Sequence, residues 1–104
     1  MIRLDPDRRR VYGPRGQTWL SFAEHALLQT MLVAGFNQPV SHKKLTDAAW
    51  PWLDSEPAGS RLRTCICRVR SALTYIGGAR IVAVYPGAYK IEAIPTPIAF
   101  ARAA

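Results

Sequence analysis

The stretch from Ser60 to Ile76 combines a clear helical period with a high density of arginine, and the rest of the chain must supply a core for it. At about 100° per residue on a helix, five aliphatic side chains of this stretch fall on one side. They are Leu62, Ile66, Val69, Leu73 and Ile76. This spacing predicts a long amphipathic helix whose apolar side packs inward.

The opposite side of this helix carries small residues between two rows of arginine. The small residues are Ser60, Thr64, Cys67 and Ser71, and the arginines are Arg61 and Arg68 on one flank and Arg63 and Arg70 on the other. Small side chains let a helix backbone come close to base edges, so this face suits the major groove of DNA. The guanidinium groups would reach phosphates or a guanine edge. The alternative interpretation is a solvated arginine face on an ordinary helix.

The distribution of charge favours the nucleic-acid interpretation. The 104 residues include 14 Lys and Arg against 7 Asp and Glu, for a net charge of +7. Between Pro57 and Ile91 there is no acidic residue, and the six basic residues of this segment supply +6. The other eight basic and seven acidic residues therefore contribute only +1. A regional excess of this kind indicates a polyanion-binding face rather than general solubility.

Length and composition indicate one small globular domain, because 49% of the residues are hydrophobic and 20% are charged. No apolar run approaches the roughly 20 residues of a membrane span, and the N-terminus lacks a signal pattern, so we expect a cytoplasmic protein.

The two cysteines and two histidines do not form a metal-binding pattern. Cys65 and Cys67 lie two residues apart on the expected helix, so their side chains point about 160° apart and can neither bridge nor share a metal. We expect two free thiols in a reducing compartment. No spacing joins a nucleophile to a base, and no glycine-rich phosphate loop follows a strand, so we expect neither an enzyme nor a cofactor.

The first half of the chain predicts a small sheet followed by two helices. Ser21 and Glu24 form a capping box at the start of a mostly apolar helix that ends at Gly35, and we expect this helix to be buried from several sides. Ser41 caps a second helix that runs to about Trp50. Short strand patterns separated by turn residues precede these helices, at 2–4, 10–12 and 18–20.

The second half predicts a third helix and a hairpin. We expect the arginine-rich helix over about 57–76 and a β-hairpin over 79–91 that turns at Pro86 and Gly87. The predicted fold is therefore α+β: a winged helix-turn-helix with a small N-terminal antiparallel sheet, a three-helix core and a C-terminal hairpin as the wing. We expect this domain over 1–93 and a C-terminal tail over 94–104.

Taken in order, these motifs resemble the OmpR/PhoB-type winged helix-turn-helix effector domain, and the resemblance runs from about residue 2 to 92. The matching segments are Leu4-Asp5-Pro6, Arg8-Arg9-Arg10-Val11, Ser21-Phe22-Ala23-Glu24 with Leu27-Leu28, Val40-Ser41 with Leu45 and Ala48-Ala49-Trp50, Ile66-Cys67-Arg68-Val69-Arg70 with Leu73, and Val84 with Tyr89. The resemblance implies that the third helix enters the major groove and that the wing lies beside the minor groove.

The resemblance also implies roles for single residues. Arg68 would contact a base, Arg70 would face the DNA backbone, and Trp50 would lie near a phosphate or serve as a lid on the core. The remaining groove-facing positions are Arg61, Arg63, Thr64 and Cys67, with Ser71 on the same face.

Four features depart from the family pattern. Arg63 stands where an acidic residue is common, and Cys65 stands where a histidine is common. Tyr85 replaces the usual wing arginine, so Lys90 or Arg80 would have to supply a basic contact. Most members also carry a phosphoacceptor receiver domain, whereas this sequence begins with the effector domain, so we expect a stand-alone form.

The leading hypothesis is a sequence-specific regulator of transcription that binds double-stranded DNA. The resemblance suggests pairs on direct repeats, and a monomer that pairs on DNA fits it equally. A second hypothesis is a protein-interaction module that docks RNA polymerase or another transcription protein through Trp52, Leu53 and the tail residues 98–100. Cys67 is either a small residue chosen for close groove approach or a redox sensor whose thiolate the neighbouring arginines favour.

Overall fold

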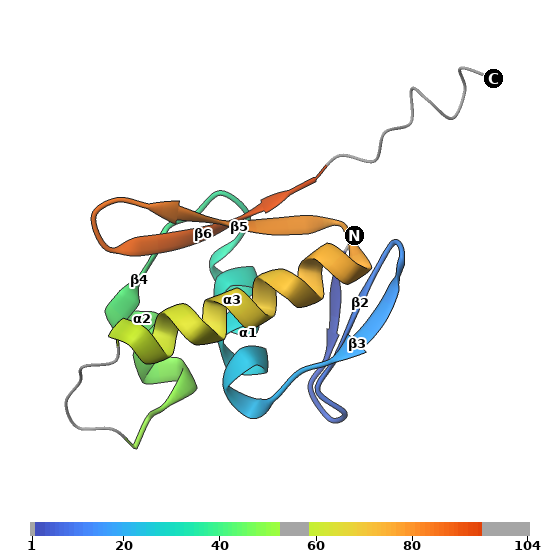
Figure 1. Ribbon diagram of the computed structural model, residues 1–104, viewed down its shortest axis with the longest axis horizontal. Coiled ribbons are helices and arrows are strands. Elements are labelled where there is room, and N and C mark those ends of the chain that lie inside the picture. The colour runs from blue at the N-terminus through green and yellow to red at the C-terminus, as the bar shows by residue number, and fades with distance from the viewer. Residues whose placement is uncertain (1, 53–58, 95–104) are drawn as a thin grey trace.

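Two small antiparallel sheets pack against three helices in the computed structural model of the chain, which describes residues 2–52 and 59–94 (Figure 1). The elements follow the order β1 (Arg3–Asp5), β2 (Arg10–Gly13), β3 (Gly16–Trp19), α1 (Phe22–Ala34), β4 (Val40–Ser41), α2 (His42–Ala49), α3 (Gly59–Ile76), β5 (Ala79–Val84) and β6 (Ala88–Ala93). The predicted α+β winged helix-turn-helix is confirmed, although the residues before Gly59, where the third helix was also expected, lie outside the described part.

The N-terminal sheet has the strand order β1-β2-β3. Leu4, Val11 and Thr18 lie opposite one another across the three strands, and Val11 is fully buried. The predicted strands are confirmed, with bounds that shift by one or two residues. The last pair of the β2–β3 ladder joins Gly13 to Gly16, so the connection between these strands is very short.

Helix α1 begins with the predicted capping box. The amide of Glu24 donates to Ser21 Oγ at 3.3 Å, and the amide of Ser21 donates to Glu24 Oε1 at 3.1 Å. Leu27, Leu28 and Met31 are buried in the core. The expectation of burial from several sides is wrong for one side of the helix, because Val33 is 81% exposed. No neighbouring element covers that side within the described residues.

Helix α3 supplies the largest share of the core from one face. All five residues of its predicted apolar side are buried, and Cys65 is buried beside them. Helix α2 begins with the predicted cap, in which Ser41 Oγ accepts from the amide of Lys44 at 3.1 Å, and it buries Leu45 and Ala49. The helical period therefore predicts the inward side of α3 correctly.

The second sheet has the strand order β4-β6-β5, and its long hairpin is the wing. Residues alternate along the hairpin: Ile81, Tyr89 and Ile91 are buried against the core, while Arg80 and Lys90 lie on the outer face. Strand β6 continues to Ala93, two residues beyond the predicted hairpin. The hairpin lies alongside α3, and its tip is near the N-terminal end of that helix (Figure 1).

The turn between β2 and β3 holds the C-terminal end of α3. The amide of Arg15 donates to the Ile76 carbonyl at 2.8 Å, and the Arg15 guanidinium donates to the Thr74 carbonyl. Gly13 lies so close that a Cβ atom there would be 2.7 Å from the Ile76 oxygen and 2.8 Å from the Gly77 oxygen. Since the last carbonyls of a helix lack partners within the helix, these bonds fix the end of α3 to the N-terminal sheet.

Candidate nucleic-acid interface

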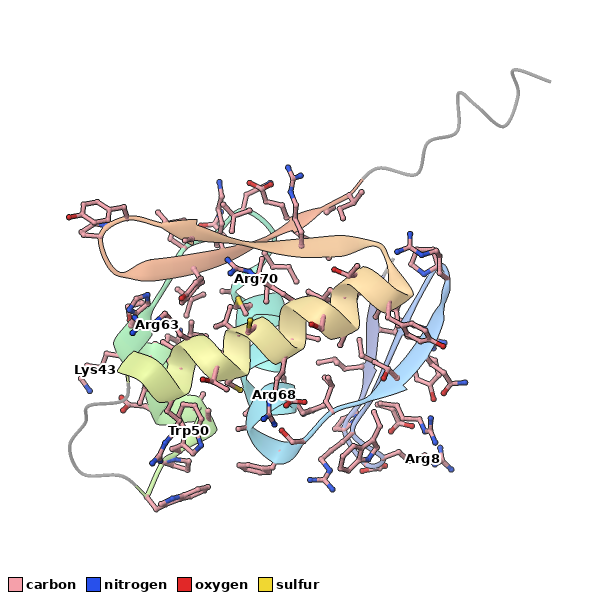
Figure 2. All side chains as sticks on the ribbon, in the orientation of Figure 1. Arg8, Lys43, Trp50, Arg63, Arg68 and Arg70 are labelled. Atoms are coloured by element: carbon pink, nitrogen blue, oxygen red, sulfur yellow. The ribbon has the colours of Figure 1, made fainter. Side chains whose placement is uncertain are left out.

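The outer face of α3 has the arrangement that the sequence predicts. Arg61, Arg63, Thr64, Cys67 and Arg68 are exposed, as are Arg70 and Ser71. Figure 2 shows Arg63 and Arg70 on the side of α3 that faces the hairpin and Arg68 on the opposite side. The side chain of Ser60 lies outside the described residues. Two rows of arginine therefore border a strip of small side chains, hereafter the α3 face.

Trp50 lies beside Arg61, at one border of the α3 face. Trp50 is half-buried against the core, and the guanidinium carbon of Arg61 lies 5.6 Å from the centroid of its ring. This is the range of a cation–π contact. Beside it is an open hollow of about 350 Å³ between the start of α1 and α3, lined in part by Glu24, Thr64 and Arg68. Trp50 thus packs on the core and also contacts an arginine of the face.

The hairpin has Tyr85 at its tip, and its two basic residues, Arg80 and Lys90, both pair with Glu92. Tyr85 is 95% exposed. On the outer side of the hairpin, Glu92 forms two ion pairs: its Oε1 lies 2.9 Å from Arg80 Nη2, and its Oε2 lies 3.2 Å from Lys90 Nζ. The hydrogen bond from Arg80, followed by that from Lys90, holds the pKa of Glu92 below its usual value. Arg80 also lines a hollow of about 320 Å³ together with Arg70, so it lies near one arginine of α3 while it pairs with Glu92.

Arg70 is directed toward the hairpin. Its Nε donates to the Ile81 carbonyl at 3.2 Å, and its guanidinium carbon lies 5.8 Å from the ring centroid of Tyr89. The helical period placed Arg70 on the same flank of α3 as Arg63, but it did not show that this flank faces the hairpin and gave no sign of these two contacts.

The two cysteines differ in environment. Both are free thiols, as expected; Cys67 is exposed on the α3 face and Cys65 is buried. Burial, and secondarily the charge of Glu24, raise the pKa of the Cys65 thiol to about 12, while Arg68 acts in the opposite direction. Among the described residues, no three His, Cys, Asp or Glu side chains are grouped so that they could hold a metal ion.

This difference predicts a selective labelling pattern. We expect iodoacetamide at pH 8 to modify Cys67 in the folded protein and Cys65 only after unfolding, because the Cys65 thiol is both covered and kept protonated. Mass spectrometry of peptides from native and urea-treated samples measures this. Equal labelling of both thiols in the native protein would contradict the burial of Cys65.

Across residues 2–52 and 59–94, no helix has the length and apolar composition that crossing a membrane requires.

No protein-family model and no curated protein matches this chain. Solved structures do resemble it. The DNA-binding domain of the response regulator AdeR, in complex with an intercistronic region, has a TM-score of 0.70 at 16% identity, covering 89% of this chain and 95% of that one. The DNA-binding domain of Bacillus subtilis CssR has a TM-score of 0.70 at 20% identity and covers 88% and 99% of the two chains.

A third similar structure is the C-terminal domain of the nisin resistance regulator NsrR, a lantibiotic response regulator. Its TM-score is 0.71 at 21% identity, with 91% of this chain and 94% of that one covered. The resemblance to OmpR/PhoB-type effector domains is therefore confirmed at the level of the fold.

Proposed function

We propose that this domain, over 1–93, is a sequence-specific regulator of transcription that places α3 in the major groove of double-stranded DNA and the tip of the hairpin beside the minor groove. The α3 face carries this proposal. This face combines a strip of small residues with arginines along its two borders, and the sequence of α3 contains no acidic residue. The inner side of the same helix is fully buried. The fold supports it, because AdeR uses a similar domain on an intercistronic region.

Each part of the α3 face has a separate task. Arg68 reads a base edge, for which the planar guanidinium is suited because it can donate two parallel hydrogen bonds to guanine. Arg61, oriented by Trp50, and Arg63 on the opposite border contact phosphates on the two walls of the groove. Thr64, Cys67 and Ser71 keep the centre of the face narrow enough for the helix to enter.

At the wing, Tyr85 is the residue best placed to contact DNA, because it is almost fully exposed at the tip. Lys90 does not contact DNA in this proposal, because it is paired with Glu92 on the outer side of the hairpin. The regulator acts in the cytoplasm as a monomer that pairs on DNA or as a dimer.

The test of this proposal is the substitution Arg68→Ala in the full chain. A duplex selected by the wild-type protein from a random library supplies the ligand. Arg68→Ala should lose about 1–3 kcal/mol at one base position and little at the others, because a bidentate pair to one base is removed. Fluorescence anisotropy with duplexes that vary at single positions measures the loss.

Arg8→Ala is the matched control, because it removes the same charge from an exposed arginine that pairs with Asp5 on the N-terminal sheet, away from α3 (Figure 2). We expect Arg8→Ala to keep the base preferences of the wild type. Identical preferences in all three proteins would overturn the proposed role of α3.

The exposed aromatic pair near the start of α1 gives a second candidate function, a protein-docking module for RNA polymerase or another transcription protein. Trp52 is 64% exposed and lies 6.2 Å from Phe22, which is also exposed, measured between ring centroids. Leu53 and residues 98–100, named with Trp52 for this role, lie outside the described residues. Protein partners that persist after nuclease treatment would favour this function, and loss of every partner would exclude it.

A further inference from the structure

The contacts of Arg70 differ from those of the other arginines of α3. Arg61, Arg63 and Arg68 make no hydrogen bond or ion pair with another described residue, whereas Arg70 Nε donates to the Ile81 carbonyl of β5 at 3.2 Å. The same guanidinium lies 5.8 Å from the ring of Tyr89 on β6. One side chain of α3 therefore contacts both strands of the hairpin.

Tyr89 continues this contact to the second helix. Its ring stacks on the imidazole of His42 at 4.9 Å between centroids, with an interplanar angle of 25°. Tyr89 is only 7% exposed, so its ring has little freedom to move. The backbone reinforces the stack: the His42 amide donates to the Gly87 carbonyl at 2.9 Å, and Val40 lies opposite Tyr89 in the β4–β6 ladder. Arg70, Tyr89 and His42 thus link α3, the hairpin and the start of α2.

This link lies where the geometry of DNA recognition would be decided. The α3 face and the hairpin tip must contact adjacent grooves simultaneously, so the position of the hairpin relative to α3 determines whether Tyr85 can reach the DNA while Arg68 reads a base. Strand β6 pairs with both β5 and β4. Among the described side chains of α3, Arg70 is the one that donates a hydrogen bond to the hairpin backbone.

We propose that Arg70 is mainly a positioning residue that fixes the wing relative to α3, and not mainly a phosphate contact. The Tyr89 ring, which stacks on His42, supports the Arg70 guanidinium in this role. This inference rests on the proposed DNA-binding function and adds a determinant of which bases are read beside the wing. A phosphate contact needs only the positive charge, which lysine also supplies. The positioning role needs a planar group that donates through Nε and stacks on a ring, which lysine lacks.

Arg70→Lys in the full chain separates the two roles. We expect the slope of log affinity against log salt to stay the same, because the charge is kept. Affinity for the selected duplex should fall about 5- to 20-fold, because the contacts of the wing tip weaken while those of α3 remain, and the loss should fall on the base positions nearest the wing. Arg63→Lys is the matched comparison: it makes the same change on the same flank, at a proposed phosphate contact that has no hydrogen bond or ion pair with a described hairpin residue. Any loss of affinity in Arg63→Lys should not be concentrated at the base positions nearest the wing.

A double-mutant cycle with Tyr85→Ala tests the coupling directly. If Arg70 acts through the wing, Arg70→Lys should have little further effect once the tip side chain is removed, so the two losses are not additive. Additive losses would show that Arg70 does not act through Tyr85 and would overturn the proposal, as would an unchanged affinity and base preference in Arg70→Lys.

A measurement without DNA keeps this test independent of the proposed function. Hydrogen exchange of the hairpin amides over 79–91 should be faster in Arg70→Lys than in Arg63→Lys, with the core amides of α1 unchanged in both. If the wild type binds no duplex but the exchange difference is present, the DNA-binding proposal fails while the structural part of this inference stands. Equal exchange in the two variants would overturn the inference itself.

Discussion

Gly13→Ala should lower the free energy of unfolding by about 2–4 kcal/mol, a large part of the total for a domain of this size. The added methyl group would lie 2.7 Å from the Ile76 oxygen and 2.8 Å from the Gly77 oxygen. Both are backbone atoms at the end of α3, so neither can move away by a change of rotamer. Either the β2–β3 turn or the end of the helix must shift, and the Arg15 bonds to Ile76 and Thr74 would lengthen with it.

Urea unfolding followed by circular dichroism measures this effect. Gly87→Ala is the matched control, because a Cβ atom at Gly87 meets nothing within 4 Å and its backbone is not in the left-handed region. We expect the control to change stability by less than about 1 kcal/mol. If the two variants unfolded at the same urea concentration, the close packing of the β2–β3 turn against α3 would be wrong.

The anchoring of α3 at its C-terminal end connects stability with function. The arginines of the α3 face lie along the part of the helix that precedes this anchor, and the inner side of the helix is buried throughout its described length. A helix held along one side and at its end keeps its outer face in a fixed orientation. This favours base reading, which needs donors placed within hydrogen-bonding distance of base edges.

Local patterns in the sequence predicted the elements of this fold well. The spacing of Leu62, Ile66, Val69 and Leu73 identified the inner side of α3, because burial on a helix repeats with its turn. The capping box at Ser21 located the start of α1, because its hydrogen bonds join residues only three apart. Such signals are contained in a few consecutive residues and can be read without knowing the fold.

The contacts that position the candidate site are not local, and the sequence did not reveal them. Arg15 and Thr74 are 59 residues apart, and Arg70 and Ile81 are 11 apart across a turn. An arginine that binds a carbonyl of another element has the same sequence signature as one that faces solvent. Lys90 illustrates this: its charge suggested a contact with DNA, and only the register of β5 with β6 shows that it pairs with Glu92.

The affinity for DNA should depend steeply on salt, and the arginines that border the α3 face should set that dependence. Each phosphate neutralised by a basic side chain contributes about −0.9 to the slope of log affinity against log salt. With three or four such contacts, affinity should fall roughly 40- to 150-fold between 50 and 200 mM salt. The double substitution Arg61→Gln with Arg63→Gln should reduce the slope by about 2, because it removes one phosphate contact on each wall of the groove.

The decisive comparison is with Arg8→Gln and Arg10→Gln, which remove the same total charge from the N-terminal sheet. Arg8 pairs with Asp5 and Arg10 donates to Gln17, so both are engaged within that sheet, and Arg8 lies away from α3 (Figure 2). Titrations of the selected duplex at several salt concentrations should give the control pair the slope of the wild type. If both pairs of substitutions flattened the slope equally, binding would follow the net charge of +7 and not the arrangement of arginines on α3.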